Sequence, residues 1–378
     1  MRICFLSNGY GEDKAAAAIA GRLRDGYTGV EVVAAPMVTA GDCYSKLGIP
    51  LLTSGRLPPS GGFPLKSLKG FVLDCGCVLR YTAYTHELAR RRSEIDRAVA
   101  VGDVTLLSLA ALSLRGCAVF VDLAKSSHKG SHYRIEEAIL RRIGCRVLAR
   151  DDHTCRDLSG KGIDALYLGN PMMDGLGVNR IGLGDEPTVG LLPGSRSEVG
   201  ANLLSILRVV EMLPAGVAFV CAISPSLPVE GIIQEVARDG WEGDSGSLGK
   251  DGRTVLLLRD GFAEMVSRAR VVIGLAGSAN EQAAGLGIPV VSFVGRGPQT
   301  TARRMRDQER LMGGAVRFVR GHPEGVAAEV MRLLADPEAR AARGAIGISR
   351  MGPPGASEAI ARFLACEFGL ESTRAIAA

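Results

Sequence analysis

The sequence has few aromatic residues and no cysteine pair with zinc-binding spacing. One of its 378 residues is Trp, and Phe, Tyr and Trp together make up 5%. Sugar-binding modules that stack ligands on exposed rings are therefore disfavoured. Nine cysteines are scattered along the chain without a C-x-x-C motif. We therefore expect reduced, buried thiols and no metal site.

A long hydrophobic run and a large excess of charge are also missing. The longest apolar stretch, residues 104–114, is about half of the roughly 20 residues that cross a bilayer as a helix. The formal charge of +5 is too small to indicate nucleic-acid binding, but it suits anionic small molecules or an anionic membrane surface. We expect a soluble, cytoplasmic protein without a signal peptide, or one in peripheral contact with the inner face of the plasma membrane.

Three common enzyme motifs are absent. The sequence contains no Walker A loop and no G-x-S-x-G nucleophile elbow. Its Gly9-Tyr10-Gly11 segment lacks the third glycine of a dinucleotide fingerprint and has Lys14 there instead. A Rossmann-type dehydrogenase is therefore disfavoured, and no cofactor is expected.

Short apolar strands alternate with helices in both halves of the chain. Strands are predicted over residues 3–6, 30–34, 95–101, 118–121, 146–149 and 165–168, and again over residues 188–192, 217–222, 255–258, 271–275 and 289–294. A helix is expected over residues 13–23, a long loop over residues 39–70, and a Gly-rich insertion over residues 240–252. The strands are continuously apolar, as in parallel sheets that are covered on both faces.

This pattern predicts an α/β protein of two doubly wound, Rossmann-like domains. The chain is longer than a single core usually supports. We place the first domain at residues 1–180, the second at residues 181–345, and a crossover helix that packs back on the first domain at residues 346–378. Ligands bind beyond the carboxyl ends of parallel strands, so two such sheets facing each other would form a cleft.

Two strand-to-helix turns in the second half suit phosphate binding. Pro193-Gly194-Ser195-Arg196 combines a glycine, a helix start and a guanidinium group. Residues 277–282, Gly-Ser-Ala-Asn-Glu-Gln, repeat this arrangement with small residues that leave room for a phosphate or ribose. The alternatives are a plain tight turn at Arg196 and a capping box formed by Ser278 and Glu281.

These segments resemble the lipid-A-disaccharide synthase family. Residues 168–174 (Leu-Gly-Asn-Pro-Met-Met-Asp) and 192–198 (Leu-Pro-Gly-Ser-Arg-Ser-Glu) are similar to that family's V-G-H-P-L and L-L-P-G-S-R-x-x-E segments. Residues 277–289 resemble its G-T-A-T-L-E…P segment and the donor loop of the MurG-type transferases. The resemblance is strongest over residues 165–310. It implies a GT-B fold and metal-free transfer of a UDP-activated sugar, of GlcNAc type, to a lipid-linked acceptor.

The resemblance also implies roles for individual residues on the donor side. The diphosphate would be held by Gly194, Ser195 and Arg196, and the second donor loop would be formed by Gly277, Ser278 and Ala279 with the adjoining Asn280. Either Gln282 or Glu281 would bind the ribose. Gln299 and Gln308 would reach the sugar, and Phe262 and Met265 would contact the uracil.

The acceptor side departs further from the family. Asn170 replaces the usual histidine, and Val101-Gly102-Asp103-Val104-Thr105 keeps one of two expected acids. Asp103 is the best candidate for the general base, with Asp13 and Glu12 as runners-up. Gly11 and Glu12 are also expected to bind substrate. Each of these carboxylates could instead simply cap a helix.

Two other functional classes remain open. One is a UDP-sugar 2-epimerase, an isomerase of the same fold. The other is a GT-B protein that binds nucleotide sugars or lipids without catalysis, an idea motivated by the missing acid and by Asn170.

Three further segments have weaker functional interpretations. His128 and His132 could form an i, i+4 metal pair, but a basic loop that contacts lipid phosphate is the favoured interpretation. Residues 58–64 could form a flap for a lipid tail or an ordinary surface loop. The arginines at 90–92 and 303–304 are expected on solvated helix faces.

Overall fold

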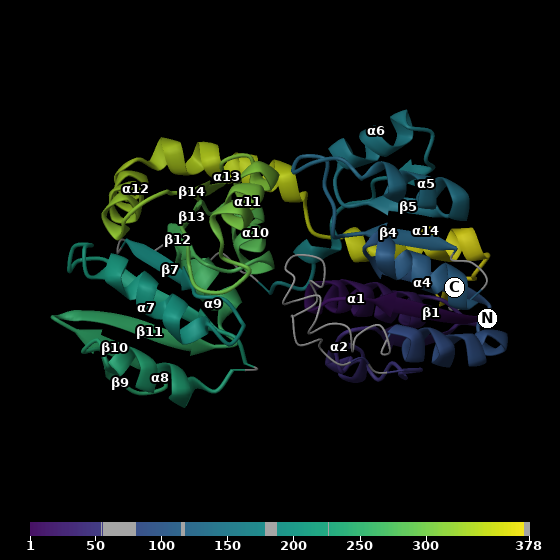
Figure 1. Ribbon diagram of the computed structural model, residues 1–378, viewed down its shortest axis with the longest axis horizontal. Helices are drawn as coiled ribbons and strands as arrows, with labels where there is room; N and C mark the ends of the chain where they lie inside the picture. Colours follow the sequence, from purple (N-terminus) through teal and green to yellow (C-terminus); the bar gives the residue numbers. More distant parts are fainter. Residues whose placement is uncertain (54, 56–80, 115–117, 178–186, 226, 374–378) are drawn as a thin grey trace. The chain divides into compact units, whose positions relative to one another are not determined.

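The computed structural model describes residues 1–53, 55, 81–114, 118–177, 187–225 and 227–373. The chain forms two compact units (Figure 1): unit 1 comprises residues 1–174 and 353–378, and unit 2 comprises residues 175–352. The predicted boundary at residue 345 falls inside helix α13 (Pro337–Met351). This helix stays with unit 2 because its glycines allow close packing: a Cβ at Gly347 would lie 2.0 Å from the carbonyl oxygen of Ala284.

Parallel strands form the sheet of unit 1. In the described residues of this unit the strand order is β2-β1-β3-β4-β5-β6, with all pairs parallel. The strands are β1 (Arg2–Ser7), β2 (Glu31–Pro36), β3 (Arg97–Gly102), β4 (Val119–Asp122), β5 (Arg146–Ala149) and β6 (Ala165–Leu166). This order confirms the predicted parallel sheet.

Helices cover both faces of this sheet. They are α1 (Tyr10–Gly26), α2 (Asp42–Ser45), residues 81–90, α4 (Val104–Leu114), α5 (Arg134–Ile143), α6 (Asp152–Gly160) and α14 (Ala356–Phe368), with 3-10 turns at η2 (Arg92–Glu94) and η3 (Pro171–Met173). Ile3 and Phe5 pack in one core with residues of α1 and α14. Cys4, between them, packs in a second core with residues of α4. The C-terminal helix therefore completes the core of unit 1.

The sheet of unit 2 is parallel except at one edge. In its described residues the order is β14-β13-β12-β7-β8-β11-β10-β9. The strands are β7 (Thr188–Leu192), β8 (Ala218–Ile223), β9 (Glu242–Gly243), β10 (Ser247–Lys250), β11 (Arg253–Arg259), β12 (Val271–Gly274), β13 (Val290–Ser292) and β14 (Val316–Phe318). The Gly-rich insertion at residues 240–252 contains a hairpin, in which β9 and β10 pair antiparallel. A Cβ at Gly243 would lie 2.0 Å from the carbonyl oxygen of Ser247, so the hairpin needs glycine at this position.

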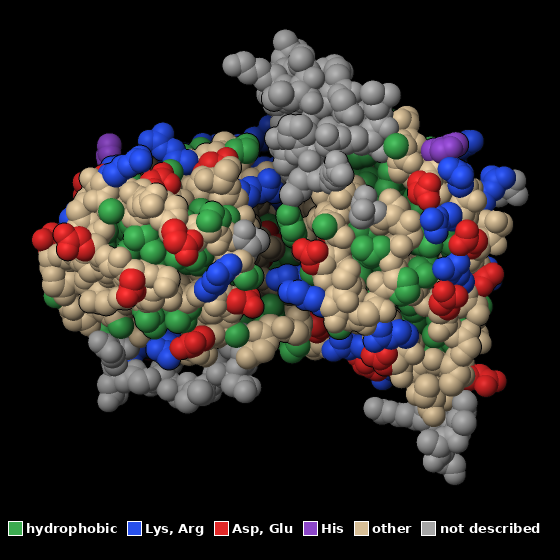
Figure 2. Space-filling model, turned by 90° about the horizontal axis from the view of Figure 1, so that it is seen from below, with side chains coloured by type: hydrophobic (Ala, Val, Ile, Leu, Met, Phe, Trp, Pro, Cys, Tyr) green, Lys and Arg blue, Asp and Glu red, His purple; other side chains and the backbone are tan. Residues whose placement is uncertain are grey.

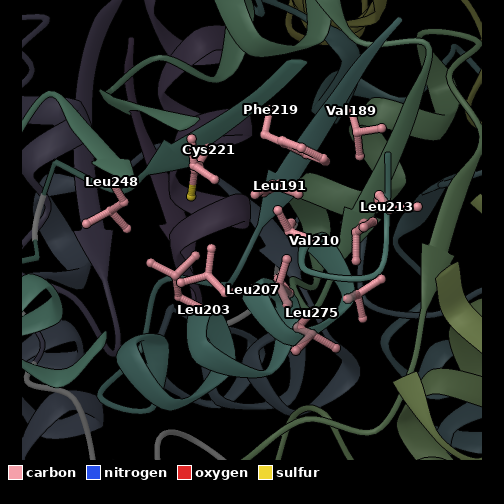
Figure 3. Packing of buried hydrophobic residues seen from close by; sticks show 14 of the residues in the cluster. Val189, Leu191, Leu203, Leu207, Val210, Leu213, Phe219, Cys221, Leu248 and Leu275 are labelled. Atoms are coloured by element: carbon pink, nitrogen blue, oxygen red, sulfur yellow. The ribbon is translucent and has the colours of Figure 1, made fainter. Parts of the chain in front are cut away.

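Alternate residues of strand β7 face the two sides of the unit 2 sheet. The helices of this unit are α7 (Val199–Val210), α8 (Val229–Ala237), α9 (Phe262–Arg268), α10 (Ser278–Gly285), α11 (Ala302–Met312), α12 (Pro323–Ala335) and α13. Val189 and Leu191 pack in one core with Leu203 and Leu207 of α7 (Figure 3). Gly190 lies on the other side, where a Cβ would be 2.2 Å from the sulfur of Met265 on α9.

Several local predictions need correction. Helix α1 begins at Tyr10 rather than near residue 13, so Glu12 and Asp13 lie within its first turn. The prediction also missed α6, although Asp151 caps it by accepting from the Thr154 N–H at 2.7 Å. Residues 42–45, predicted as loop, form α2.

Two surface properties bear on the expected membrane contact. No helix within the described ranges is long and apolar enough to cross a membrane. Figure 2 shows the molecule from below, and on the described part of this face Lys and Arg side chains are interspersed with Asp and Glu side chains. The segment 58–64, predicted as a flap or surface loop, lies outside the described residues.

Candidate functional site

The two predicted donor turns lie side by side at one edge of unit 2. Strands β7 and β12 are parallel neighbours, with Leu192 opposite Gly274 at their carboxyl ends. The Leu275 N–H donates to the carbonyl oxygen of Leu192 at 2.8 Å. Residues 193–196 and 276–282 therefore leave the sheet together, which is the arrangement that a shared phosphate site requires.

The first turn exposes polar groups at the start of α7. Gly194 has a φ of 102°, in the left-handed region that glycine tolerates best. Ser195 and Arg196 are exposed, and α7 begins at Val199. The first N–H groups of a helix lack intrahelical partners and carry partial positive charge. The turn can therefore bind an anion with both backbone and guanidinium donors.

The second turn begins α10 without the predicted capping box. Its N-cap is Gly277, and no side chain caps the helix. Ser278 is the first helical residue and is exposed, as is Gly277, whereas Ala279 is half-buried. This turn therefore also presents accessible backbone and a hydroxyl group at a helix start.

Gln308 on α11 supports the second turn from below the surface. Its Nε2 donates to the Gly277 carbonyl oxygen at 2.9 Å, and its Oε1 accepts from Nδ2 of Asn280 at 3.0 Å. Gln308 is 7% exposed and Asn280 is fully buried. The structure thus places both side chains as supports of the loop, in contrast to the predicted sugar contact of Gln308.

Glu281 and Gln282, the two candidates for binding the ribose, are half-buried in the first turns of α10. The choice between them stays a prediction.

The predicted uracil contacts differ in accessibility. The Met265 side chain is fully buried and packs against Gly190 in the core, and its contact with uracil stays a prediction. The sequence did not indicate this burial, because a methionine near a helix start looks the same whether it faces the sheet or a ligand. Phe262, the first residue of α9, is half-buried at the carboxyl end of β11. Gln299 is half-buried in the loop before α11.

Carboxylates gather at the corresponding edge of unit 1. Asp103 follows β3 and accepts at Oδ1 from the Leu106 N–H at 2.9 Å, so it caps α4 as the alternative interpretation predicted. Burial raises the pKa of Asp103, while hydrogen bonds from Leu106, Asn8 and Thr105 oppose this shift. The residue is only half-buried. It therefore combines accessibility with a pKa shifted toward that of a general base.

Glu12 and Asp13 are placed less favourably than Asp103. The Glu12 carboxylate lies against Gly9, where a Cβ would be 2.1 Å from Oε2. Burial raises the pKa of Glu12, and the charges of Asp103 and Asp13 raise it further. Asp13 is 2% exposed and accepts from the Thr39 hydroxyl. The Asp13 carboxylate is enclosed in the core and is therefore less accessible than that of Asp103, and its role as a base stays a prediction.

The two histidines singled out in the sequence do not form a pair. His132 is buried, and its Nε2 lies 2.9 Å from Oδ2 of the equally buried Asp122. Burial raises the pKa of Asp122, against the effect of His132. The ring of His128 instead stacks on His153, with centroids 4.5 Å apart. The metal-pair interpretation is therefore wrong, because the two rings are engaged with different neighbours.

Comparisons with known proteins identify relatives by structure alone. No protein-family model matches the chain, and no curated protein matches it by sequence. Among solved structures, UDP-GlcNAc 2-epimerase from Neisseria meningitidis bound to UDP-GlcNAc has a TM-score of 0.60 at 15% identity, over 96% of this chain and 99% of that one. MurG from Acinetobacter baumannii has a TM-score of 0.60 at 14% identity, over 96% and 98%. The calicheamicin glycosyltransferase CalG4 has a TM-score of 0.62 at 15% identity, over 97% and 98%.

The fold is GT-B. Glycosyltransferases and epimerases match nearly the whole length of this GT-B chain, including both parallel-sheet units and the C-terminal helices. The predicted fold class, a GT-B protein with two parallel-sheet α/β units, is confirmed. At these identities the likeness establishes architecture only, so functional roles must be argued from the residues of each unit.

Proposed function

We propose that this protein is an inverting glycosyltransferase that moves a GlcNAc-type sugar from a UDP-sugar to a lipid-linked acceptor. The observation that carries the proposal is the junction of the two donor turns at the ends of β7 and β12. Two helix starts and Arg196 meet there, and such fixed donors can stabilise a diphosphate leaving group without a metal ion. The nature of the acceptor rests on the sequence resemblance to lipid-A-disaccharide synthases.

In the proposed reaction each unit has its own role. Unit 2 binds the UDP-sugar, with Gly194, Ser195 and Arg196 on the diphosphate. The acceptor oxygen forms a bond to the anomeric carbon while the bond from that carbon to UDP breaks, and the electron pair leaves with UDP. The hydroxyl proton passes to a carboxylate on the acceptor side, and Asp103 is the candidate for this base. Its raised pKa favours this transfer, since a base is most effective when its pKa lies near the working pH.

A second candidate function is epimerisation of a UDP-sugar. The similarity in fold to UDP-GlcNAc 2-epimerases favours it, because the donor half of such an enzyme would have the same architecture. An epimerase needs no acceptor. The two activities therefore differ in whether a product forms from UDP-GlcNAc alone.

A ligand screen followed by product analysis tests the proposal. Thermal unfolding is measured with UDP, UDP-GlcNAc, UDP-Glc, UDP-Gal and GDP-sugars, and a ligand at 100 times its Kd should stabilise the protein by about 2.7 kcal/mol. Sugar transfer is then followed with and without a lipid-linked acceptor. Conversion of UDP-GlcNAc without acceptor would favour the epimerase, and binding without any turnover would favour a non-catalytic role. Failure of every nucleotide to stabilise the protein would overturn the proposal.

A further inference from the structure

Helix α11 begins beside both donor turns. The loop before it, residues 293–301, lies against the start of α7, because the Arg296 N–H donates to Oδ1 of Asn202 at 2.6 Å. In the same loop a Cβ at Gly297 would lie 2.6 Å from the carboxyl group of Glu198. The loop thus fixes the start of α11 next to the turn that carries Arg196.

Within α11, one face is directed at the second donor turn. Gln308 holds Gly277 and Asn280 through hydrogen bonds, and α10 and α11 lie side by side (Figure 1). Arg304 precedes Gln308 by four residues, so both side chains lie on the same helical face. Arg304 is half-buried, whereas the adjacent Arg303 is exposed. The sequence alone predicted a solvated face for both arginines, and this prediction is wrong for Arg304.

Arg304 also lies within electrostatic reach of Arg196. Burial lowers the pKa of Arg304, and the positive charges of Arg303 and Arg196 lower it further, against the opposing charge of Asp307. The Arg304 guanidinium is partly buried and that of Arg196 is exposed, so their like charges repel each other, and an anion bound beside both would relieve this repulsion. A diphosphate offers oxygens on two phosphorus atoms, and guanidinium groups bind such oxygens through paired hydrogen bonds.

We infer that Arg304 is a second diphosphate-binding residue, which together with Arg196 makes the donor site selective for a nucleoside diphosphate over a monophosphate. The inference rests on the proposed function and adds to it a residue that the sequence did not indicate. Arg196 would reach the diphosphate from the turn after β7, and Arg304 would reach it from α11. A monophosphate has fewer oxygens and would form fewer hydrogen bonds with these two guanidinium groups.

Binding measurements with three ligands test this role. Titration calorimetry is done with UDP, uridine and inorganic pyrophosphate on the wild type, Arg304→Gln, Arg304→Lys and the control Arg303→Gln. Loss of a charge-assisted contact should raise the Kd of Arg304→Gln for UDP and pyrophosphate roughly 10- to 100-fold, with little change for uridine. Arg304→Lys should be intermediate, because it keeps the charge and loses the planar fork. Arg303→Gln should bind like the wild type.

Other outcomes separate this inference from the proposed function. If UDP-sugars are turned over but Arg304→Gln binds UDP and pyrophosphate as the wild type does, the role of Arg304 is overturned and the proposed function stands. If pyrophosphate binds in an Arg304-dependent way but no UDP-sugar is converted, the diphosphate role stands and the proposed function falls. Equal weakening for uridine and UDP in both Arg304 variants would mean that Arg304 only maintains the fold, and would also overturn the inference.

Discussion

Nε2 of Gln308 donates to the carbonyl oxygen of Gly277 at 2.9 Å, joining helix α11 to the N-cap of α10. The same side chain accepts from Asn280, so one buried amide contacts two residues of the second donor turn. A donor loop that binds a diphosphate with backbone N–H groups must keep its shape before the ligand arrives. Gln308 supplies this rigidity from beneath the loop.

We expect Gln308→Leu to loosen the donor loop. The change leaves the Gly277 carbonyl without this donor and the buried Asn280 amide without this acceptor, which should lower the free energy of unfolding by about 1–3 kcal/mol and raise the Kd for UDP. Urea denaturation and calorimetry measure the two effects. Gln234→Leu, on the exposed side of α8, is the matched control and should change neither. Unchanged UDP affinity in Gln308→Leu would mean that the loop keeps its shape without this hydrogen bond.

Arg196→Ala should lower the rate of sugar transfer by about 10²-fold or more, the effect of losing one preorganised donor to the leaving group. The rate is measured at saturating acceptor. Arg208→Ala, in the same region of the chain, removes a guanidinium that pairs with Asp239 at the surface, and it should leave the rate unchanged. Near-normal turnover of Arg196→Ala would remove this residue from the diphosphate site.

Asp103→Asn separates the catalytic role of Asp103 from its capping role. Asn caps helices as well as Asp does, so the fold should persist while the base is lost. We expect kcat to fall by about 10²- to 10⁴-fold with an unchanged Kd for UDP. Asp336→Asn, the same change at the N-cap of α13, should leave kcat unchanged. A normal kcat in Asp103→Asn would exclude this residue as the base.

The raised pKa of Asp103 determines how kcat should change with pH. Only the ionised carboxylate accepts a proton, so kcat should be full at high pH and should fall as the pH drops through a value above the ordinary Asp range. The contribution of this group to folding stability has the opposite sign, because the folded state binds the proton more tightly and gains stability as the pH falls. A pH profile of kcat should therefore show an acid limb in the wild type and none in Asp103→Asn. Identical limbs in both proteins would assign the titration to another group.

Two glycine substitutions of the same kind should have opposite effects on stability. Gly190→Ala would place a Cβ 2.2 Å from the sulfur of buried Met265, and overpacking of this kind should cost about 1–3 kcal/mol. Gly231→Ala, in α8, meets nothing within 4 Å and should raise the free energy of unfolding by about 0.5–1 kcal/mol. Thermal or urea unfolding compares the two. A stable Gly190→Ala protein would mean that α9 moves freely over the sheet.

The sequence by itself determined the alternation of the main strands and helices and the position of the two strand-to-helix turns that we propose as donor turns. Continuous apolar runs such as residues 188–192 form buried parallel strands because every side chain must be covered. Glycine at the end of a strand marks a turn, since it alone tolerates φ values such as that of Gly194. These are local properties, and they were sufficient for the fold class.

Only the tertiary structure decided which side chains reach the edges of the two sheets. Asp13 and Asp103 both lie at the start of a helix that follows a parallel strand. Thr39 and the core enclose Asp13, whereas Asp103 is only half-buried. Likewise, nothing in the sequence around Arg304 distinguishes it from Arg303. Burial and electrostatic reach depend on contacts between segments that are distant in the chain, here α11 with the turns after β7 and β12, and such contacts exist only once the sheet has paired β7 with β12.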